Sequence, residues 1–251
     1  MRDNSLRPGG EKSLMIKGST VLRRLYYRAQ MLRPKAQSNE CQIIKSLTKN
    51  APHTFIEFGF HPIEFNCSAL ARDPTWDGLL IDGNKRQIMD AKALLPSRLK
   101  IIEAFLTLEN IDFIKSMFED LGVLSIDVDG NDYWFLKELI STDPFLICIE
   151  YNSSLGHEPI TIPYEMFFDR HKKHPRAWYH GASLSALSRL CSTYGYGLAA
   201  VSEAGTNAFF TKTGNLDPIA SWRPNRLREK FSGIAHEQQW QSLRDFPFIR
   251  V

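Results

Sequence analysis

Short apolar runs alternate with segments of helical periodicity through the middle of the chain. The apolar runs have the length of strands and lie at 54–60, 79–81, 98–106, 121–130 and 145–152. Each is followed by apolar residues at helical spacing, at 64–72, 85–95, 109–120, 132–140 and 183–194. This alternation predicts βαβ units and a mainly parallel sheet in an α/β fold. Two last runs, 196–203 and 207–212, flank the turn EAGTN and predict a closing hairpin, which brings the sheet to seven strands.

The segments on either side of this core have a different pattern. Residues 1–18 are rich in charge and turn formers, which predicts disorder, and 19–32 have a loose apolar face that predicts an amphipathic helix. The tail after Pro218 is polar, with two short helical patterns. We therefore expect three regions: a basic, partly disordered and partly helical extension over 1–50, a core over 51–215, and a helical tail over 216–251.

Composition and charge narrow the class of partner. The 251 residues are 43% hydrophobic and 24% charged, which is typical of a soluble globular protein. The formal net charge is only +3, yet residues 1–36 hold nine Lys and Arg against two Asp and Glu, a local charge of +7. A basic arm before a mildly acidic body favours contact with an anionic surface such as a membrane. A solvated tail, or a helix that covers its own domain, is the alternative.

Cysteine spacing and hydropathy add two expectations. The four cysteines have no C-x-x-C spacing, so the sequence indicates free thiols rather than a zinc site. No apolar run reaches the ~18 residues of a membrane span, and no secretory signal opens the chain. We expect a cytoplasmic protein, with membrane association through the basic arm as an open alternative.

Carboxylates follow most of the expected strands. Ligands of open α/β sheets bind at the carboxyl ends of the strands, and four of these five ends carry an acid, namely Glu57, Asp82, Asp127 with Asp129, and Glu150. The turn after the first strand has one glycine, Gly59, where a dinucleotide fingerprint needs three. An acid at the tip of the second strand suits ribose hydroxyls. The pattern therefore favours a ligand with adenosine but no phosphate, and S-adenosylmethionine (SAM) fits this description.

Three stretches resemble class I SAM-dependent methyltransferases of the FkbM type. LSIDVDGND is similar to the D-V-E-G-x-E element of that family, FIEFGF to the E-x-G core of its first motif, and GLLIDGN to its acidic second-strand tip. The resemblance covers about 52–213 and lacks the second glycine of the first motif. It implies a Rossmann-like, doubly wound, seven-stranded sheet whose last strand is antiparallel. It also implies O-methylation of a sugar, glycan or related small metabolite, as in polysaccharide biosynthesis.

The resemblance and the strand ends together give a set of cofactor-binding candidates. Gly59 would let the cofactor approach the backbone, Asp82 would accept the ribose hydroxyls, and Asn66 would take over part of the contact of the missing glycine. The full set is Glu57, Gly59, Asn66, Asp82, Gly83, Asn84, Ala104, Phe105 and Asp127.

Proton transfer and metal binding give two further sets. Methylation of a hydroxyl needs a base, and the candidates are His157 first, then His180 and Asp127. A divalent cation such as Mg²⁺ is permitted by the hard oxygen ligands of Asp129, Glu150 and Asn152. In the alternative, one aspartate contacts SAM and the others hold loops. Asp132 is expected to be the N-cap of the helix over 132–140.

The long loop over 153–183 is expected to bind the acceptor. Its aromatic side chains would either stack on a sugar or form a small core of their own; they are Tyr164, Phe167, Phe168, Trp178 and Tyr179. The rival functions are a nicotinamide-dependent oxidoreductase and a non-catalytic module that docks to a membrane assembly. We expect no nucleic-acid partner, and a homodimer remains open.

Overall fold

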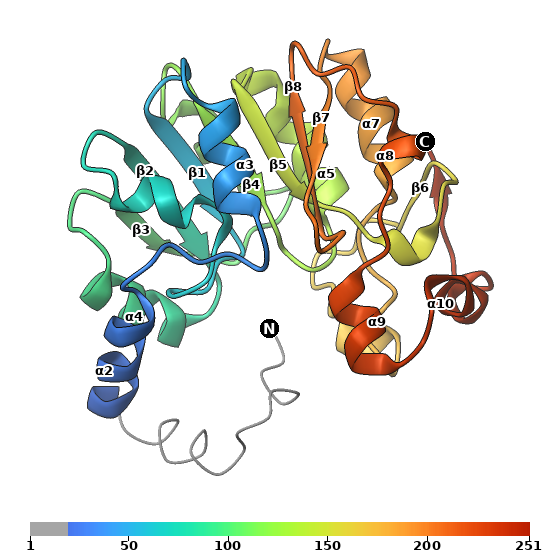
Figure 1. Cartoon of the computed structure of the whole chain (residues 1–251), viewed down its shortest axis with the longest axis horizontal. Coiled ribbons are helices and arrows are strands. Elements are labelled where there is room, and N and C mark those ends of the chain that lie inside the picture. Colours follow the sequence, from blue (N-terminus) through green and yellow to red (C-terminus); the bar gives the residue numbers. More distant parts are fainter. Residues whose placement is uncertain (1–19) are drawn as a thin grey trace.

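The computed structural model describes residues 20–251, so the disorder predicted over 1–18 lies outside the described residues. Seven strands form one sheet in the order β3-β2-β1-β4-β5-β8-β7 (Figure 1). They are β1 (Thr54–Phe58), β2 (Asp77–Asp82), β3 (Lys100–Glu103), β4 (Val123–Ile126), β5 (Leu146–Glu150), β7 (Gly197–Val201) and β8 (Asn207–Thr211).

The pairing confirms the predicted sheet. The pairs β1–β2, β1–β4, β2–β3 and β4–β5 are parallel, and β8, the last of the seven, is antiparallel to both β5 and β7. Starting from β1, the strands β2 and β3 are added on one side of the sheet, and β4 and β5 are added on the other side. Phe58 pairs with both Ile81 and Ile126, so β1, β2 and β4 end at the same level. A ligand crevice is expected at this reversal of strand order.

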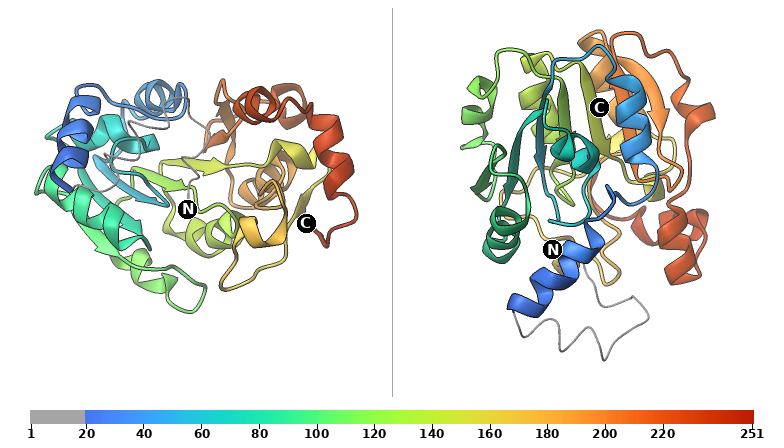
Figure 2. Two further views of the ribbon diagram at one scale, coloured as in Figure 1. Left: turned by 90° about the horizontal axis from the view of Figure 1, so that it is seen from below. Right: turned by 60° about the vertical axis from the view of Figure 1, so that its left-hand side comes forward.

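Helices cover both faces of the sheet, as the views in Figure 2 show. One face carries η3 (Ile111–Ser116), α5 (Asp132–Leu139) and α7 (Leu184–Thr193), whose buried residues share a core with Ile56 and Phe58 of β1. The other carries α3 (Glu40–Leu47), η2 (Asn66–Arg72) and α4 (Lys85–Leu94), whose buried residues share a core with Phe55. Alternate residues of β1 thus enter opposite cores, which explains its continuous apolar run.

Several predicted elements are shorter in the structure, among them the strand expected at 121–130, which is confined to β4. The helices expected at 64–72 and 109–120 are the shorter 3₁₀ helices η2 and η3. Pro74 follows η2 closely and discourages a longer helix. The strand expected at 98–106 is confined to β3, because the chain leaves the sheet at Ala104 to enter the wall of a cavity.

The flanking regions pack against the core. At the N-terminal side, α2 (Thr20–Gln30) lies on α4. At the other end, α8 (Pro218–Ser221), α9 (Arg226–Ser232) and α10 (His236–Leu243) lead to β9 (Ile249–Arg250). β9 pairs with β6 (Ile160–Thr161), and this long-loop region also holds η5 (Ser153–Leu155) and α6 (Arg170–Lys173); η4 (Ile140–Thr142) extends α5. Within residues 20–251, every helix is too short or too polar to cross a bilayer.

Candidate active site

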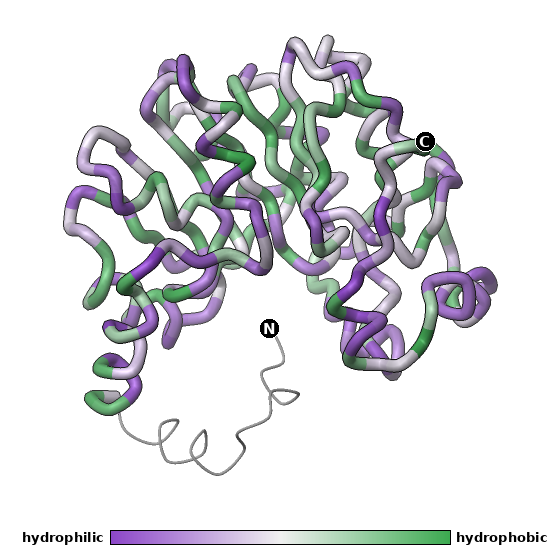
Figure 3. The backbone as a smooth tube through the Cα atoms, in the orientation of Figure 1, coloured by the Kyte–Doolittle hydropathy of each residue, from purple (hydrophilic) through white to green (hydrophobic). Residues whose placement is uncertain are grey.

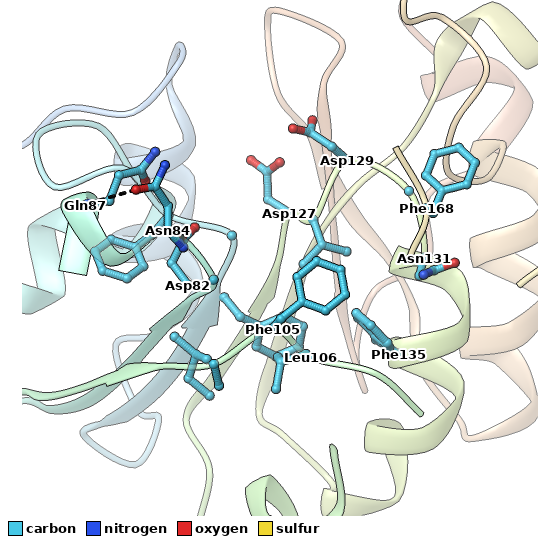
Figure 4. A pocket seen from close by; sticks show the side chains of 18 residues that line it. Asp82, Asn84, Gln87, Phe105, Leu106, Asp127, Asp129, Asn131, Phe135 and Phe168 are labelled. Carbon is cyan, nitrogen blue, oxygen red and sulfur yellow. Dashed lines mark hydrogen bonds between the residues drawn. The ribbon is translucent and has the colours of Figure 1, made fainter. Parts of the chain in front are cut away.

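A cavity of about 250 Å³ opens at the carboxyl ends of β1, β2 and β4. In Figure 4, Asp82, Asn84 and Gln87 lie on one side of it, and Asp127 and Asp129 lie on the other. The described residues that line it are Phe58, Gly59, Phe60, Ile81, Asp82, Gly83, Asn84, Gln87, Ala104, Phe105, Leu106, Asp127, Val128, Asp129, Gly130, Asn131, Phe135 and Phe168.

Gly59 lets two strand ends meet at this cavity. Its φ is +77°, and a Cβ at this position would lie 1.7 Å from the backbone oxygen of Asp127. Its N–H donates to the carbonyl of Ile81 at 3.1 Å. A residue with a side chain would therefore push β1 and β4 apart.

Glu57 and Asn66 lie behind the cavity wall instead of in it. The buried Glu57 carboxylate accepts hydrogen bonds from the backbone N–H groups of Asn66 at 2.8 Å and Cys67 at 2.7 Å. The Asn66 amide donates to Ser125 Oγ at 3.2 Å. Neither residue is among the described lining residues, so the structure does not bring them to the other cofactor-binding candidates. Glu57 instead caps the start of η2.

Burial raises the pKa of Glu57 from 4.5 to about 7, against the lowering effect of its two backbone hydrogen bonds. A folded-state pKa above the unfolded value stabilises the protein fully below pH 4.5, and this contribution is lost as pH rises through about 7. Relative to Glu57→Gln, the wild-type unfolding free energy should fall by about 3 kcal/mol across that window. Urea denaturation of both proteins between these pH values tests this; a constant difference would contradict it.

The tip of β2 forms the opposite wall. Asp82 Oδ1 accepts the N–H of Asn84 at 2.6 Å, which holds the turn. Asn84 in turn caps α4, accepting from the N–H groups of Arg86 and Gln87. Gly83 lies against Phe105, where a Cβ would approach the ring at 3.3 Å. Asp82 and its neighbours thus form a rigid edge beside the apolar residues that follow β3.

Asp127, Asp129 and Glu150 come together at the ends of β4 and β5. Each offers an oxygen, and these oxygens lie within 4.8 Å of one another. Asp127 and Asp129 do not continue the strand with their side chains on one face, because β4 ends at Ile126 and Asp129 adopts a left-handed φ of 61°. Arg170 Nη1 lies 2.6 Å from Asp129 Oδ1. The cluster could hold a divalent cation, and a guanidinium already lies against one of its members.

Asn152 does not join this cluster. Its side-chain nitrogen donates to the carbonyls of Trp178 and His180, at 2.7 and 2.8 Å. Its oxygen accepts from Arg228 at 2.8 Å and from the N–H of Ser154 at 3.1 Å. Asn152 therefore anchors the long loop and α9, and its amide is committed away from the carboxylates.

Asp132 is not the N-cap of α5, because the helix begins with it. Its carboxylate accepts the N–H groups of Val128 and Gly130, both at 2.9 Å, and so holds the preceding loop. Asn131 occupies the N-cap position and makes no side-chain cap bond to the described helix. Burial, with a further contribution from Asp127, raises the pKa of Asp132 to about 7.

The two histidine candidates lie apart from the cavity. His157 is exposed and packs on Trp222, with ring centroids 5.1 Å apart. His180 is 1% exposed, with Nε2 2.9 Å from Arg228 and Nδ1 3.9 Å from Glu150 Oε2. Burial and Arg228 lower the pKa of His180 well below its usual value, so it is neutral. Neither histidine is among the described lining residues, whereas Asp127 is.

The aromatic residues of the long loop fall into two groups. Some lie at or beside the cavity, and others form a small core. Phe168 lines the cavity, and Phe167 is 72% exposed beside Phe105, with ring centroids 5.8 Å apart. Trp178 and Tyr179 are buried in a small core with Leu243 of α10. The first pair is placed to meet a ligand, and the second pair holds the loop to the tail.

Several residues at or near the site were missed by the sequence interpretation. Gln87 lies in the first turn of α4, three residues after the N-cap Asn84. The helix predicted over 85–95 therefore already placed Gln87 near the end of β2. Asn131 carries its own sequence cue, because it follows two acids and a glycine at the end of a strand. Arg170 reaches Asp129 from the long loop, and Arg228 reaches His180 from the tail; their spacing in the sequence gives no indication of either contact.

Comparison with known proteins gives a likeness in fold. No family model matches the chain, and no curated protein does. The O-methyltransferase from Bacillus cereus in complex with S-adenosylhomocysteine (SAH) is 13% identical, with a TM-score of 0.49 over 82% of this chain and 91% of that one. A SAM-dependent methyltransferase from Thiobacillus denitrificans, also with SAH, is 14% identical, with a TM-score of 0.40 over 72% of each chain. The mitomycin 7-O-methyltransferase MmcR is 15% identical, with a TM-score of 0.42 over 79% of this chain and 60% of that one.

Proposed function

We propose that the protein is a SAM-dependent methyltransferase of the FkbM type that O-methylates a small acceptor such as a sugar or glycan. One observation carries the proposal. The backbone amides that open η2, where a Rossmann fold would hold a pyrophosphate, are already bonded to the buried Glu57. The cavity in front of them is edged by Asp82 and Asp127. Such a site favours an adenosine ligand with a cationic half over a dinucleotide.

The cavity offers a distinct surface for each part of SAM. Asp82 is placed to accept the ribose hydroxyls, and the apolar surface of Ala104, Phe105 and Leu106 suits adenine. Asp127 lies across the cavity from Asp82, on the side that the methionine part would approach. Bound SAM would supply an electrophilic methyl group on a sulfonium. The contribution of the protein is to exclude water and to orient both reactants.

Asp127 is the proposed proton acceptor, because it is the catalytic candidate that lines the cavity. Phe168 and Asn131 extend the wall on this side, where an acceptor hydroxyl would lie next to the acid. Glu150 belongs to the same carboxylate cluster, and burial together with Asp127 raises the pKa of Glu150 well above its usual value. This shift favours the protonated form of Glu150, which reduces repulsion between the carboxylates.

A divalent cation at Asp127, Asp129 and Glu150 is a second proposal, and it competes with Arg170 for Asp129. Replacing Arg170 with alanine should tighten Mn²⁺ binding by about tenfold or more, because a positive charge leaves the cluster. Titration calorimetry with Mn²⁺ alone measures this. The control is Lys172→Ala, on the same helix, whose side chain is 83% exposed. Equal affinities in both variants would count against a cation at this place.

Titration calorimetry with SAM, SAH and NADH tests the proposed function. We expect binding of the first two and none of the third. Binding of NADH alone would replace the proposal with the oxidoreductase alternative. No binding of any of them would favour the non-catalytic module. A panel of sugars with methyl-labelled SAM then tests the acceptor class.

A further inference from the structure

Helix α2 presents its apolar side to solvent. The side chains that face the domain are Arg23, which is 7% exposed, and the half-buried Arg24 and Tyr27. Val21, Leu25 and Tyr26 are 67%, 55% and 44% exposed, and Leu32 just beyond the helix is 84% exposed. The hydrophobic segments of α2 appear green at the lower left of Figure 3. This is the reverse of an ordinary surface helix, which turns its apolar stripe to the core.

Asp90 of α4 fixes this orientation. It is 2% exposed and accepts Arg23 Nε at 2.6 Å, Arg23 Nη2 at 3.0 Å and Arg24 Nε at 3.0 Å. Paired, charge-assisted bonds of this kind are strong and directional. A rotation that buried the apolar stripe would leave Asp90 buried and unpaired, which is strongly unfavourable. The outward apolar face is therefore built into the fold.

The helix lies at the end of the molecule where the cavity opens. α2 projects beyond the carboxyl ends of the strands in Figure 1 and in the right-hand view of Figure 2. Tyr27 Oη is 3.4 Å from His61 Nε2, in the turn that follows β1 and Gly59. At the cavity itself, Phe105 is 54% exposed beside the exposed Phe167. Apolar side chains are thus presented both on α2 and beside the cavity.

Charge decides which partner suits this face. The exposed Arg28 and Arg33 flank the apolar stripe, and the sequence before the helix, residues 1–19, holds four Lys and Arg against two acids. An apolar face flanked by basic residues is the pattern of helices that lie in an anionic lipid interface. A symmetric dimer through the same face would bring the arginines of two copies together, where they repel.

We propose that α2 docks the protein onto an anionic lipid surface, with the apolar face of Val21, Leu25, Tyr26 and Leu32 in the interface and Arg28 and Arg33 among the headgroups. In this orientation the cavity opens toward the bilayer. If the proposed methyltransferase function holds, the acceptor is therefore a membrane-borne molecule, such as a lipid-linked glycan.

Sedimentation with vesicles tests the docking without any need for cofactor or activity. We expect the full chain to bind vesicles of equal parts phosphatidylcholine and phosphatidylglycerol, and to bind pure phosphatidylcholine much more weakly. Arg28→Gln with Arg33→Gln should weaken binding about 25-fold, since each basic residue near such a surface contributes about fivefold. Leu25→Ser with Tyr26→Ser should weaken it by about tenfold or more.

The matched control is Ile219→Ser with Phe231→Ser, two exposed apolar residues of the tail, which are 62% and 54% exposed. It should bind like the wild type. Equal binding by all variants, or no preference for anionic lipid, would overturn the proposal. A dimer detected by light scattering and lost in the Leu25 variant would assign the face to a second copy instead. Because vesicle binding and SAM binding are measured separately, failure of one leaves the other standing.

Discussion

Replacing Gly59 with alanine should destabilise the protein by about 3 kcal/mol or more and abolish SAM binding by the protein that remains folded. A Cβ at this position would lie 1.7 Å from the carbonyl oxygen of Asp127, which is backbone and cannot rotate away. The φ of +77° adds strain for any residue with a side chain. Relief requires the ends of β1 and β4 to separate, and these ends form the cavity floor.

Gly233 provides the matched control for this variant. Its φ is +68° in the left-handed helical region, and an added Cβ would meet nothing within 4 Å among the described residues. Gly233→Ala should therefore cost only about 1 kcal/mol, from the backbone conformation alone. Urea denaturation measures both variants. Equal losses of unfolding free energy in the two variants would show that the contact with Asp127 does not contribute to the destabilisation.

The sheet could be predicted from sequence because its strands are buried on both sides. Val123–Ile126 and Leu146–Glu150 are buried along their whole length, so each is a continuous apolar run between polar turns. The 3₁₀ helices were harder to predict. Asn66–Arg72 packs between α3 and β1, so it is buried at almost every position. This burial arises from tertiary packing, and the local sequence therefore has no periodic pattern that would reveal the element.

The site was predictable where a side chain lies at the tip of its own strand. Asp82 and Asp127 line the cavity for this reason. Glu57 shows the limit of the same rule. It belongs to β1 itself, so its side chain enters the face of the sheet and bonds to the start of η2. A position one residue nearer the turn would have placed it in the cavity.

Residues supplied by distant segments could not be predicted in the same way. Arg170 reaches Asp129 from the long loop, and Arg228 reaches Asn152 and His180 from α9. Burial lowers the pKa of Arg228 to about 10, so it remains a cation inside the protein. A sequence reveals surplus carboxylates at strand ends, but only the fold reveals which cations compensate them. The sequence alone therefore could not decide whether a metal ion or arginine side chains neutralise these carboxylates.

Replacing Asp82 with asparagine should weaken SAM and SAH binding about 100-fold, since hydrogen bonds to a charged acceptor contribute about 1.5–3 kcal/mol each and ribose offers two hydroxyls. Asparagine retains the oxygen that accepts the N–H of Asn84, so the turn at the end of β2 should be preserved. The control is Asp77→Asn at the exposed start of the same strand, which changes the charge equally and should leave affinity unchanged. Titration calorimetry gives both affinities, and melting curves establish that both variants are folded. If Asp82→Asn bound SAH as tightly as Asp77→Asn, the ribose would have to lie elsewhere, and the assignment of this cavity to an adenosine cofactor would fail.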